Sequence, residues 1–509
     1  MPDMTIRLSR RRCAALVLVL LGLSPAAAMA QQNQANPYYE FLHARRLEAA
    51  GDADGALASL QRAANADPAS AEIKAEIAAL HFRKRPVARV EAEKAAKEAL
   101  AIDAKNVEAN SILGYLYATS VDNARAASAS PDDIKNAVTH LERAVAGTIG
   151  IDLQMQYTLG RMYLRNNEPQ KAVQVISKVV AQSPANESAR RLLAAAHVSA
   201  GNLKGAIATL SEVIDFVPEL AADLARYLEQ DGQMREAAAA YTVALAEQPS
   251  NRELKLQRIL ALMKAREFTQ AAAFAGEARK QHPDDLNFTN FQAQALFEAG
   301  DRNGAIALAE ASAKANPRDL QTQLTLATLY SDAGRTSEAL TITESAAKTF
   351  PNNKNVQFML ADAYADAGRT TDAERVLRQM LASDPSNARL LNHLGYMLAN
   401  RGEQLDEAVT LVRRALAVDP DRPEYLDSLG WAHFKRGELN EAVKYLMAAA
   451  DKLPTNSEVQ DHLGDVYARR GSLQEAIAAW NKALAGDGQG IEKAAVERKL
   501  EDARRKLPR

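Results

Sequence analysis

The sequence predicts an all-α solenoid of about thirteen stacked helical hairpins, followed by a C-terminal capping helix. The first observation behind this prediction is a series of prolines with a nearly constant spacing. Most are 34 residues apart, with one gap of 31 and one of 35: Pro184, Pro218, Pro249, Pro283, Pro317, Pro351, Pro385, Pro420 and Pro454. A fixed period of this length indicates one supersecondary unit copied many times.

Two small-residue positions accompany the prolines, and a small side chain lets two helices approach closely. An alanine stands twelve residues before every proline, and the position continues beyond the series: Ala56, Ala92, Ala137, Ala172, Ala206, Ala237, Ala271, Ala305, Ala339, Ala373, Ala408, Ala442 and Ala476. The second position, in the first half of each unit, is large only at Ile259. Its other members are Ala44, Ala78, Gly114, Gly160, Ala194, Ala225, Ala293, Ala327, Ala361, Gly395, Gly430 and Gly464.

Residues 423–456 show how one unit folds. Apolar residues three and four apart predict one buried face on each of two helices. Gly437 is expected to end the first helix, because glycine tolerates a positive φ. Pro454 is expected to end the second helix, because the residue before a proline is forced out of the α region. A lone hairpin cannot bury both apolar faces, so neighbouring units must stack.

The motif that runs from Leu159 to Pro184, Leu-Gly-x-x-Tyr…Gly…Ala…Leu…Ala…Pro, resembles the tetratricopeptide repeat (TPR) family. The resemblance covers roughly residues 37–490. It implies a right-handed superhelix whose first helices line a concave groove. Residues 491–509 are expected to form the capping helix. Its basic residues are predicted to be a solvated face rather than a binding patch: Lys499, Arg504, Arg505 and Lys506.

Residues 1–30 are predicted to be a signal peptide and residues 31–36 a linker. Arginines precede a short apolar run, and Ala28-Met29-Ala30 matches a cleavage site. The run is too short to cross a bilayer, so export to the periplasm by the general secretory route is expected, in preference to the twin-arginine route. Cys13 is the only cysteine and would leave with the signal, so neither a disulfide nor a lipid anchor is expected.

The repeat predicts three further divisions of the chain. Residues 37–217 form an N-terminal half that contains an inserted loop at 120–131, and residues 291–490 form a more regular C-terminal half. Between them, residues 218–290 are irregular, because one unit is three residues short and Ile259 occupies a small position. A hinge is predicted in that stretch.

The composition favours protein binding over catalysis or nucleic-acid binding. A net charge of -2 argues against a nucleic-acid partner, which requires a basic face. The chain has no phosphate-binding loop, nucleophile elbow, zinc-protease motif or cysteine pair, so no enzyme, cofactor or metal is expected. His81, His197 and His433 fall at a buried position of their first helices, which favours core packing over metal ligation.

The TPR resemblance implies that the fifth and ninth residues of each first helix face the groove. In the last four units these are Phe358, Asp362, Asn392, Tyr396, Asp427, Trp431, Asp461 and Asp465. An acidic groove with aromatic anchors suits a partner segment that carries Lys or Arg. Trp431 is the strongest anchor candidate, and packing between adjacent first helices is the alternative.

The segment Leu391–Ala483 also resembles bacterial envelope TPR adaptors, among them the lipoprotein partner of a carboxyl-terminal processing protease. That resemblance implies an envelope protease and its clients as partners, although this chain lacks the lipoprotein motif. Two functions remain open. The chain is a non-catalytic periplasmic adaptor that binds proteins or peptides in its groove, or a structural scaffold for an envelope polysaccharide export or secretion assembly.

Overall fold

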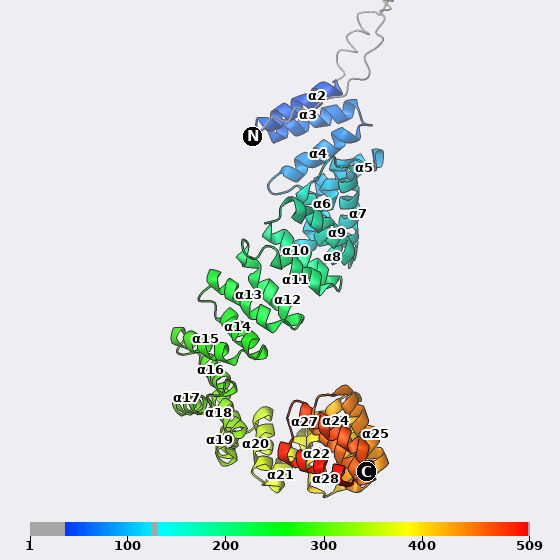
Figure 1. The fold of residues 1–509 in the computed structure, drawn as a ribbon. Coiled ribbons are helices and arrows are strands. Elements are labelled where there is room, and N and C mark those ends of the chain that lie inside the picture. Colours follow the sequence, from blue (N-terminus) through cyan, green and yellow to red (C-terminus); the bar gives the residue numbers. More distant parts are fainter. Residues whose placement is uncertain (1–35, 124–129, 507–509) are drawn as a thin grey trace, which may run out of the picture. The chain divides into compact units, whose positions relative to one another are not determined.

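The computed structural model describes residues 36–123 and 130–506, and every regular element in these ranges is a helix. In chain order, helices α2–α27 make thirteen helix–turn–helix repeats, and α28 follows them (Figure 1). The predicted all-α solenoid of hairpins with a capping helix is therefore confirmed. The predicted signal peptide, and the linker except for Asn36, lie outside the described residues.

The chain divides into two compact units that meet between Ala261 and Leu262. This boundary falls inside the stretch 218–290, where a hinge stays a prediction. The helices up to the boundary are α2 (Pro37–Ala49), α3 (Ala53–Ala66), α4 (Ala71–Arg83), α5 (Arg89–Ile102), α6 (Val107–Asn123), α7 (Pro131–Gly147), α8 (Leu153–Arg165), α9 (Pro169–Gln182), α10 (Glu187–Ser199), α11 (Leu203–Ser211), the 3-10 turn η1 (Pro218–Leu220), α12 (Ala221–Gln230), α13 (Met234–Glu247) and α14 (Arg252–Lys264), which contains the boundary.

The second unit continues with hairpins of more uniform length. Its helices are α15 (Phe268–Gln281), α16 (Leu286–Glu298), α17 (Arg302–Ala315), α18 (Leu320–Asp332), α19 (Thr336–Thr349), α20 (Lys354–Asp366), α21 (Thr370–Ser383), α22 (Ala388–Arg401), α23 (Leu405–Val418), α24 (Pro423–Arg436), α25 (Leu439–Lys452), α26 (Ser457–Arg470), α27 (Leu473–Ala485) and α28 (Lys493–Lys506). Among the described residues, no helix combines the length and the apolar character needed to cross a membrane.

The small residues lie where the two helices of a hairpin meet. All thirteen repeat alanines are buried, and only Ala339 retains any exposed surface, at 3%. Gly430 shows why the second small-residue position, on the first helix of each repeat, is also small. A Cβ atom there would lie 2.6 Å from Cγ of Leu446 and 3.1 Å from its backbone nitrogen. The hairpins therefore close over a backbone contact that a larger residue would prevent.

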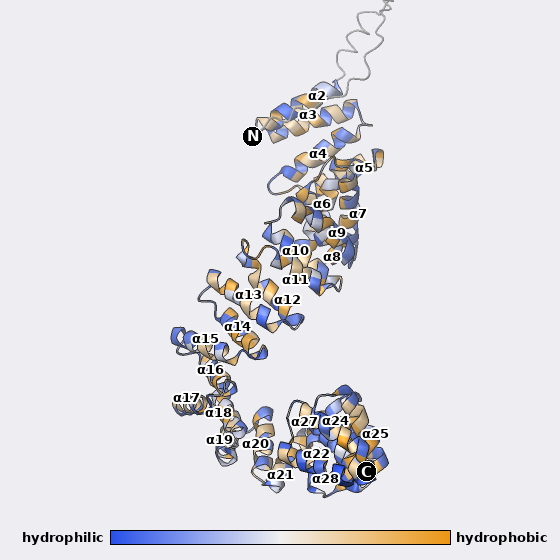
Figure 2. Ribbon diagram, viewed as in Figure 1, coloured by the Kyte–Doolittle hydropathy of each residue, from blue (hydrophilic) through white to orange (hydrophobic). Residues whose placement is uncertain are grey.

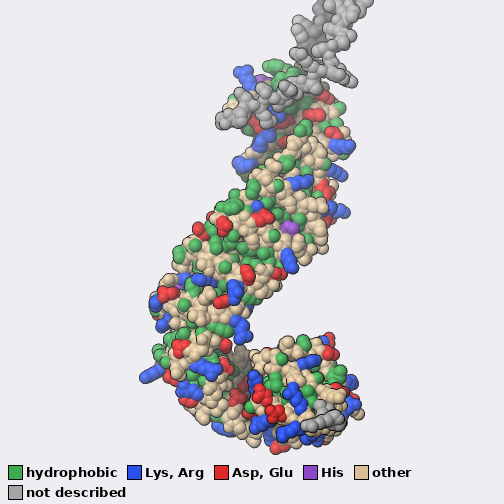
Figure 3. All heavy atoms as spheres, in the orientation of Figure 1, with side chains coloured by type: hydrophobic (Ala, Val, Ile, Leu, Met, Phe, Trp, Pro, Cys, Tyr) green, Lys and Arg blue, Asp and Glu red, His purple; other side chains and the backbone are tan. Residues whose placement is uncertain are grey.

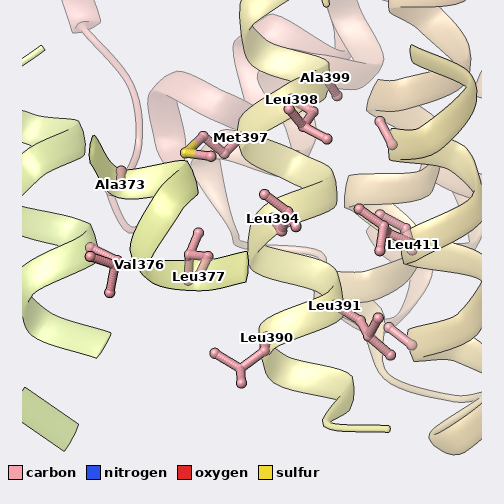
Figure 4. Packing of buried hydrophobic residues seen from close by; sticks show 14 of the residues in the cluster. Ala373, Val376, Leu377, Leu390, Leu391, Leu394, Met397, Leu398, Ala399 and Leu411 are labelled. Atoms are coloured by element: carbon pink, nitrogen blue, oxygen red, sulfur yellow. The ribbon is translucent and has the colours of Figure 1, made fainter. Parts of the chain in front are cut away.

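The hydrophobic core runs along the stack instead of forming one centre. Hydrophobic and hydrophilic residues alternate around the helices (Figure 2), as expected when each helix buries one face. One extensive buried cluster of the second unit joins α19–α24, and Figure 4 shows Leu377 of α21 beside Leu390 and Leu394 of α22. In this cluster each of the first helices α22 and α24 thus contacts its own hairpin partner and the second helix of the preceding repeat.

The helix ends agree with the sequence prediction for residues 423–456. Gly437 follows α24 with a φ of 83°, and its N–H bonds back to the helix. Helix α25 ends at Lys452, two residues before Pro454. Asn456 then starts the next unit, because its side chain accepts the N–H of Val459.

The prediction of a loop at 120–131 is wrong at both ends. Helix α6 continues through Asn123, because Val121 is 1% exposed and secures the extra turn. Helix α7 begins at Pro131, which is tolerated at the first helical position, and Ser130 caps it by accepting the N–H of Asp133. Part of the insertion therefore lengthens two helices. Residues 124–129 of the predicted loop lie outside the described residues.

The short unit and the capping helix follow the expected sequence logic. Pro218 begins η1, and α12 has ten residues, so the shortened unit is shortened in its first helix. Helix α28 begins at Lys493 and buries Val496, Leu500 and Ala503 in a cluster with Trp480. The last hairpin is thereby covered by an apolar stripe.

We expect Gly430→Ala to lower the free energy of unfolding of the second unit by about 1–2 kcal/mol, because overpacking outweighs the helix-propensity gain of alanine. Gly276→Ala on α15 is the control, since a Cβ there would meet only the amide end of the Gln292 side chain, at 2.8 Å, and that end can move. Both tryptophans, Trp431 and Trp480, lie in the second unit with both substitutions, so urea unfolding followed by tryptophan fluorescence reports on the two variants alike. A Gly430→Ala protein as stable as wild type would contradict the close backbone contact.

Candidate partner-binding groove

The predicted groove residues lie on the first helices α20, α22, α24 and α26 of the second unit. A cavity of about 370 Å³ is lined by side chains from all four helices. It brings together four of the eight predicted residues: Phe358, Asn392, Tyr396 and Asp427. The other four, on the same helices, are Asp362, Trp431, Asp461 and Asp465, and they do not line this cavity.

Asp427 forms a buried pair with a histidine of the following first helix. Nδ1 of His462 lies 3.0 Å from Oδ1 of Asp427, and both side chains are buried. Burial disfavours the imidazolium form, but the nearby carboxylates of Asp427, Glu458 and Asp461 outweigh it and raise the pKa of His462. The carboxylates around His462 therefore favour its protonated form beside Asp427.

Trp431 packs between adjacent first helices. It is 8% exposed, its ring stacks on His462 with 4.0 Å between centroids, and its Nε1–H donates to Oδ1 of Asn400 at 2.8 Å. The alternative stated for Trp431, packing between adjacent first helices, is therefore what the structure shows. A contribution of Trp431 to partner binding stays a prediction.

Asp461 and Asp465 hold one lysine of the capping helix between them. Nζ of Lys499 lies 2.9 Å from Oδ1 of Asp461 and 2.8 Å from Oδ1 of Asp465. Burial opposes the charge on Lys499, but its hydrogen bonds to Asp465 and Asp461 outweigh burial and raise its pKa. Burial, together with the neighbouring charge of Asp461, raises the pKa of Asp465. The prediction that Lys499 is a solvated charge is wrong, because α28 packs on α27 and its Lys499 reaches two aspartates of α26.

Asp362 has a similar partner on α22. Its Oδ1 lies 3.2 Å from Nε2 of His393. Burial and the nearby carboxylate of Asp366 raise the pKa of Asp362 to about 7, and burial and the charge of Arg389 lower the pKa of His393 to about 4. Between a pH of about 4 and a pH of about 7, Asp362 is therefore mostly protonated and His393 mostly neutral, so the pair carries little charge.

Tyr396 links two repeats of the second unit across the cavity, because it lies on α22 and its partner Glu458 lies on α26. Its hydroxyl donates to Oε1 of Glu458 at 2.7 Å, and burial, with the charge of Glu458, raises the pKa of Tyr396. Oδ1 of Asn392 is buried and has no hydrogen-bond partner among the described residues. On the face that Figure 3 shows, acidic and basic side chains lie beside one another over the C-terminal helices.

The sequence analysis missed that His393, His462 and Lys499 are the partners of these aspartates. Each lies about one repeat after an aspartate it contacts, His393 and His462 on the next first helix and Lys499 on the capping helix. An alignment of the repeats could have found them, because residues at neighbouring positions of consecutive repeats lie side by side in the stack. As a result, the four aspartates predicted to form an acidic groove all have internal partners.

The three histidines predicted to pack in the core differ in their burial. His433 is buried and its Nδ1 contacts Glu438, as predicted for a core residue. His81 and His197 are only half-buried, because their rings reach the helix surface. Within the residues that the structure describes, no three His, Cys, Asp or Glu side chains gather as metal ligands would.

Two family models match the chain, and both describe the tetratricopeptide repeat. One matches residues 163–227, 296–361, 332–395 and 364–432, and the other matches residues 222–286, 256–320 and 428–491. Together they cover residues 163–491, well over half of the chain. The chain belongs to the TPR family, whose members generally act as protein-binding scaffolds. Neither model describes an enzyme.

Individual relatives resemble this chain only in part. The TPR repeat-containing protein PA4667 of Pseudomonas aeruginosa is 43% identical over 68 residues, which is 13% of this chain and 12% of that protein. The match thus spans about an eighth of the relative's length.

Three solved structures match with low TM-scores. A chain of the APC/C hetero-tetramer Cut9–Hcn1 has a TM-score of 0.41 and 15% identity, over 94% of this chain and 98% of that one. Yeast Tom70 has a TM-score of 0.42 and 13% identity, over 92% and 95%. A chain of the Naa15/Naa10 complex bound to HypK has a TM-score of 0.43 and 17% identity, over 92% and 70%.

We expect the stability difference between wild type and His462→Gln to depend on pH. Because the folded pKa of His462 is raised, its contribution is fully present below the unfolded pKa of about 6.5 and is lost as the pH rises through the folded value. The difference should be about 2 kcal/mol at acidic pH. Urea unfolding followed by tryptophan fluorescence at a series of pH values measures it. Asp427→Asn should abolish the pH dependence, whereas a difference that grows with pH would contradict the assignment.

We expect Lys499→Gln to loosen α28, because two carboxylates would then face each other without a cation. The hydrogen-exchange protection of residues 493–506 should fall by about 1–2 kcal/mol, between the values for exposed and buried ion pairs. Arg498→Gln is the control, since Arg498 lies on the same helix with its side chain 73% exposed. Equal protection in both variants would show that apolar packing alone docks the helix.

Proposed function

We propose that this chain is a non-catalytic adaptor of the bacterial periplasm that binds segments of partner proteins in the groove of its second unit. The observation that supports it is the cavity of about 370 Å³ to which four successive first helices contribute. A partner segment that lies along it would contact several repeats at once, and each repeat would add a small contact. The internal ion pairs hold the groove in shape before a partner arrives, which lowers the entropic cost of binding.

The export part of this proposal is supported by the arginines, the apolar run and the cleavage motif of residues 1–30. An envelope protease and its clients are the partners that the resemblance of Leu391–Ala483 implies. The second candidate function is a structural scaffold for an envelope polysaccharide export or secretion assembly. The length of the array favours it, because thirteen hairpins offer far more surface than one bound segment occupies.

The groove can be tested by filling it. Glu424 lines the cavity with its side chain 53% exposed, so Glu424→Trp should fold normally and block the groove sterically. The matched control is Lys444→Trp on α25, where the side chain is 65% exposed and outside the cavity. We expect Glu424→Trp to reduce recovery of partners from periplasmic extracts by about tenfold. Identical partners for both variants and wild type would exclude the groove, and retention of the protein in the cytoplasm would exclude the periplasmic assignment.

A further inference from the structure

Arg389 is the cation at the mouth of the groove whose hydrogen-bonding capacity is unused. Its guanidinium stacks on Phe358, with the central carbon 3.9 Å from the ring centroid, and the side chain is exposed. Among the described residues, nothing forms a hydrogen bond or an ion pair with it. Stacking fixes the guanidinium plane while the N–H groups at its edge stay free. Such an arrangement is prepared for a carboxylate, which accepts two parallel hydrogen bonds.

The carboxylates around Arg389 already have other partners. Those that line the cavities on either side of it are Glu424 with Arg422 at 2.8 Å, Glu458 with the Tyr396 hydroxyl at 2.7 Å, Asp427 with His462 at 3.0 Å and Asp384 with Lys354 at 3.4 Å. Asp362, which acts on Arg389 electrostatically, contacts His393. Arg389 is therefore the cation at this place that has no carboxylate partner among the described residues, although the sequence predicted an acidic groove.

Arg389 also stands between two cavities. One is the groove cavity described above. The other has a volume of about 490 Å³ and is lined by α20, α21 and α22. Its lining includes the apolar side chains Val376, Met380 and Leu390, with the exposed amides of Asn355 and Gln379 beside them. Amide groups both donate and accept, so they suit the backbone of an extended peptide.

We propose that the groove binds an extended acidic segment of a partner protein. An Asp or Glu side chain of that segment pairs bidentately with Arg389, and a neighbouring apolar side chain enters the cavity over Val376 and Leu390. The segment continues into the groove cavity on the other side, so the carboxylate belongs to a side chain within the segment. This inference rests on the proposed function, because it names the chemistry that the same groove recognises.

The test is a selection of peptides from a random phage-displayed library with the full chain as bait. Wild type should enrich peptides in which Asp or Glu lies near apolar residues, and Arg389→Glu should instead enrich peptides with Lys or Arg. A synthetic copy of the most enriched peptide should bind Arg389→Ala about tenfold or more weakly in fluorescence anisotropy. Arg375→Ala, on α21 and outside both cavities, should bind like wild type. Arg389→Lys should bind with intermediate affinity, because it keeps the charge and loses the fork.

Two results would overturn the inference. One is enrichment of basic peptides by wild type, and the other is acidic peptides whose binding survives Arg389→Ala. If Glu424→Trp abolishes binding of those same peptides, the groove still binds partners and only the assigned chemistry fails. If Glu424→Trp leaves their binding unchanged, the proposed function fails with it.

Discussion

The rest of the structure depends on the close approach of two helices at one pair of small residues in each hairpin. When the ridges of one helix pack into the grooves of another, the helix axes lie about 8–10 Å apart, and a small residue on each helix permits the short end of that range. The exclusion of larger residues is visible at Gly430, where a single added carbon would reach the backbone of the opposite helix. Because small residues recur at these two positions in nearly every repeat, the hairpins share one shape, and equal shapes can stack with their apolar faces joined.

Stacking in turn brings each first helix beside the next and creates a second class of contact. Asp427 meets His462 and Tyr396 reaches Glu458, each from one first helix to a later one, and Asp465 meets Lys499 of the capping helix. These polar contacts lie on the face that the apolar stripes leave uncovered. They give these charged and polar side chains internal partners, and the last of them in the chain is completed by the capping helix. A buried charge without its partner is costly, so the register of neighbouring units is specified by chemistry as well as by shape.

The pairing changes how the groove is understood. A list of the groove positions gives four aspartates and predicts a basic ligand. In the folded chain those aspartates are partnered, and Arg389 remains, supported by Phe358 and open on its hydrogen-bonding edge. Trp431 shows the same effect, since its ring and its N–H are both engaged inside the stack. The groove's available chemistry is therefore what remains after the repeats have satisfied one another.

The sequence by itself determined the all-α class, the thirteen hairpins, the buried alanines and the helix-ending role of Gly437. These features depend on residues that lie close together along the chain, and the repeat displays each of them many times. It placed the loop at 120–131 too broadly, because Val121 is held in a helix by burial that no local pattern reveals. Only the tertiary structure decided which charged side chains form internal ion pairs and which stay available to a ligand. Those contacts join residues about one repeat apart, and they exist only once neighbouring hairpins have stacked in register.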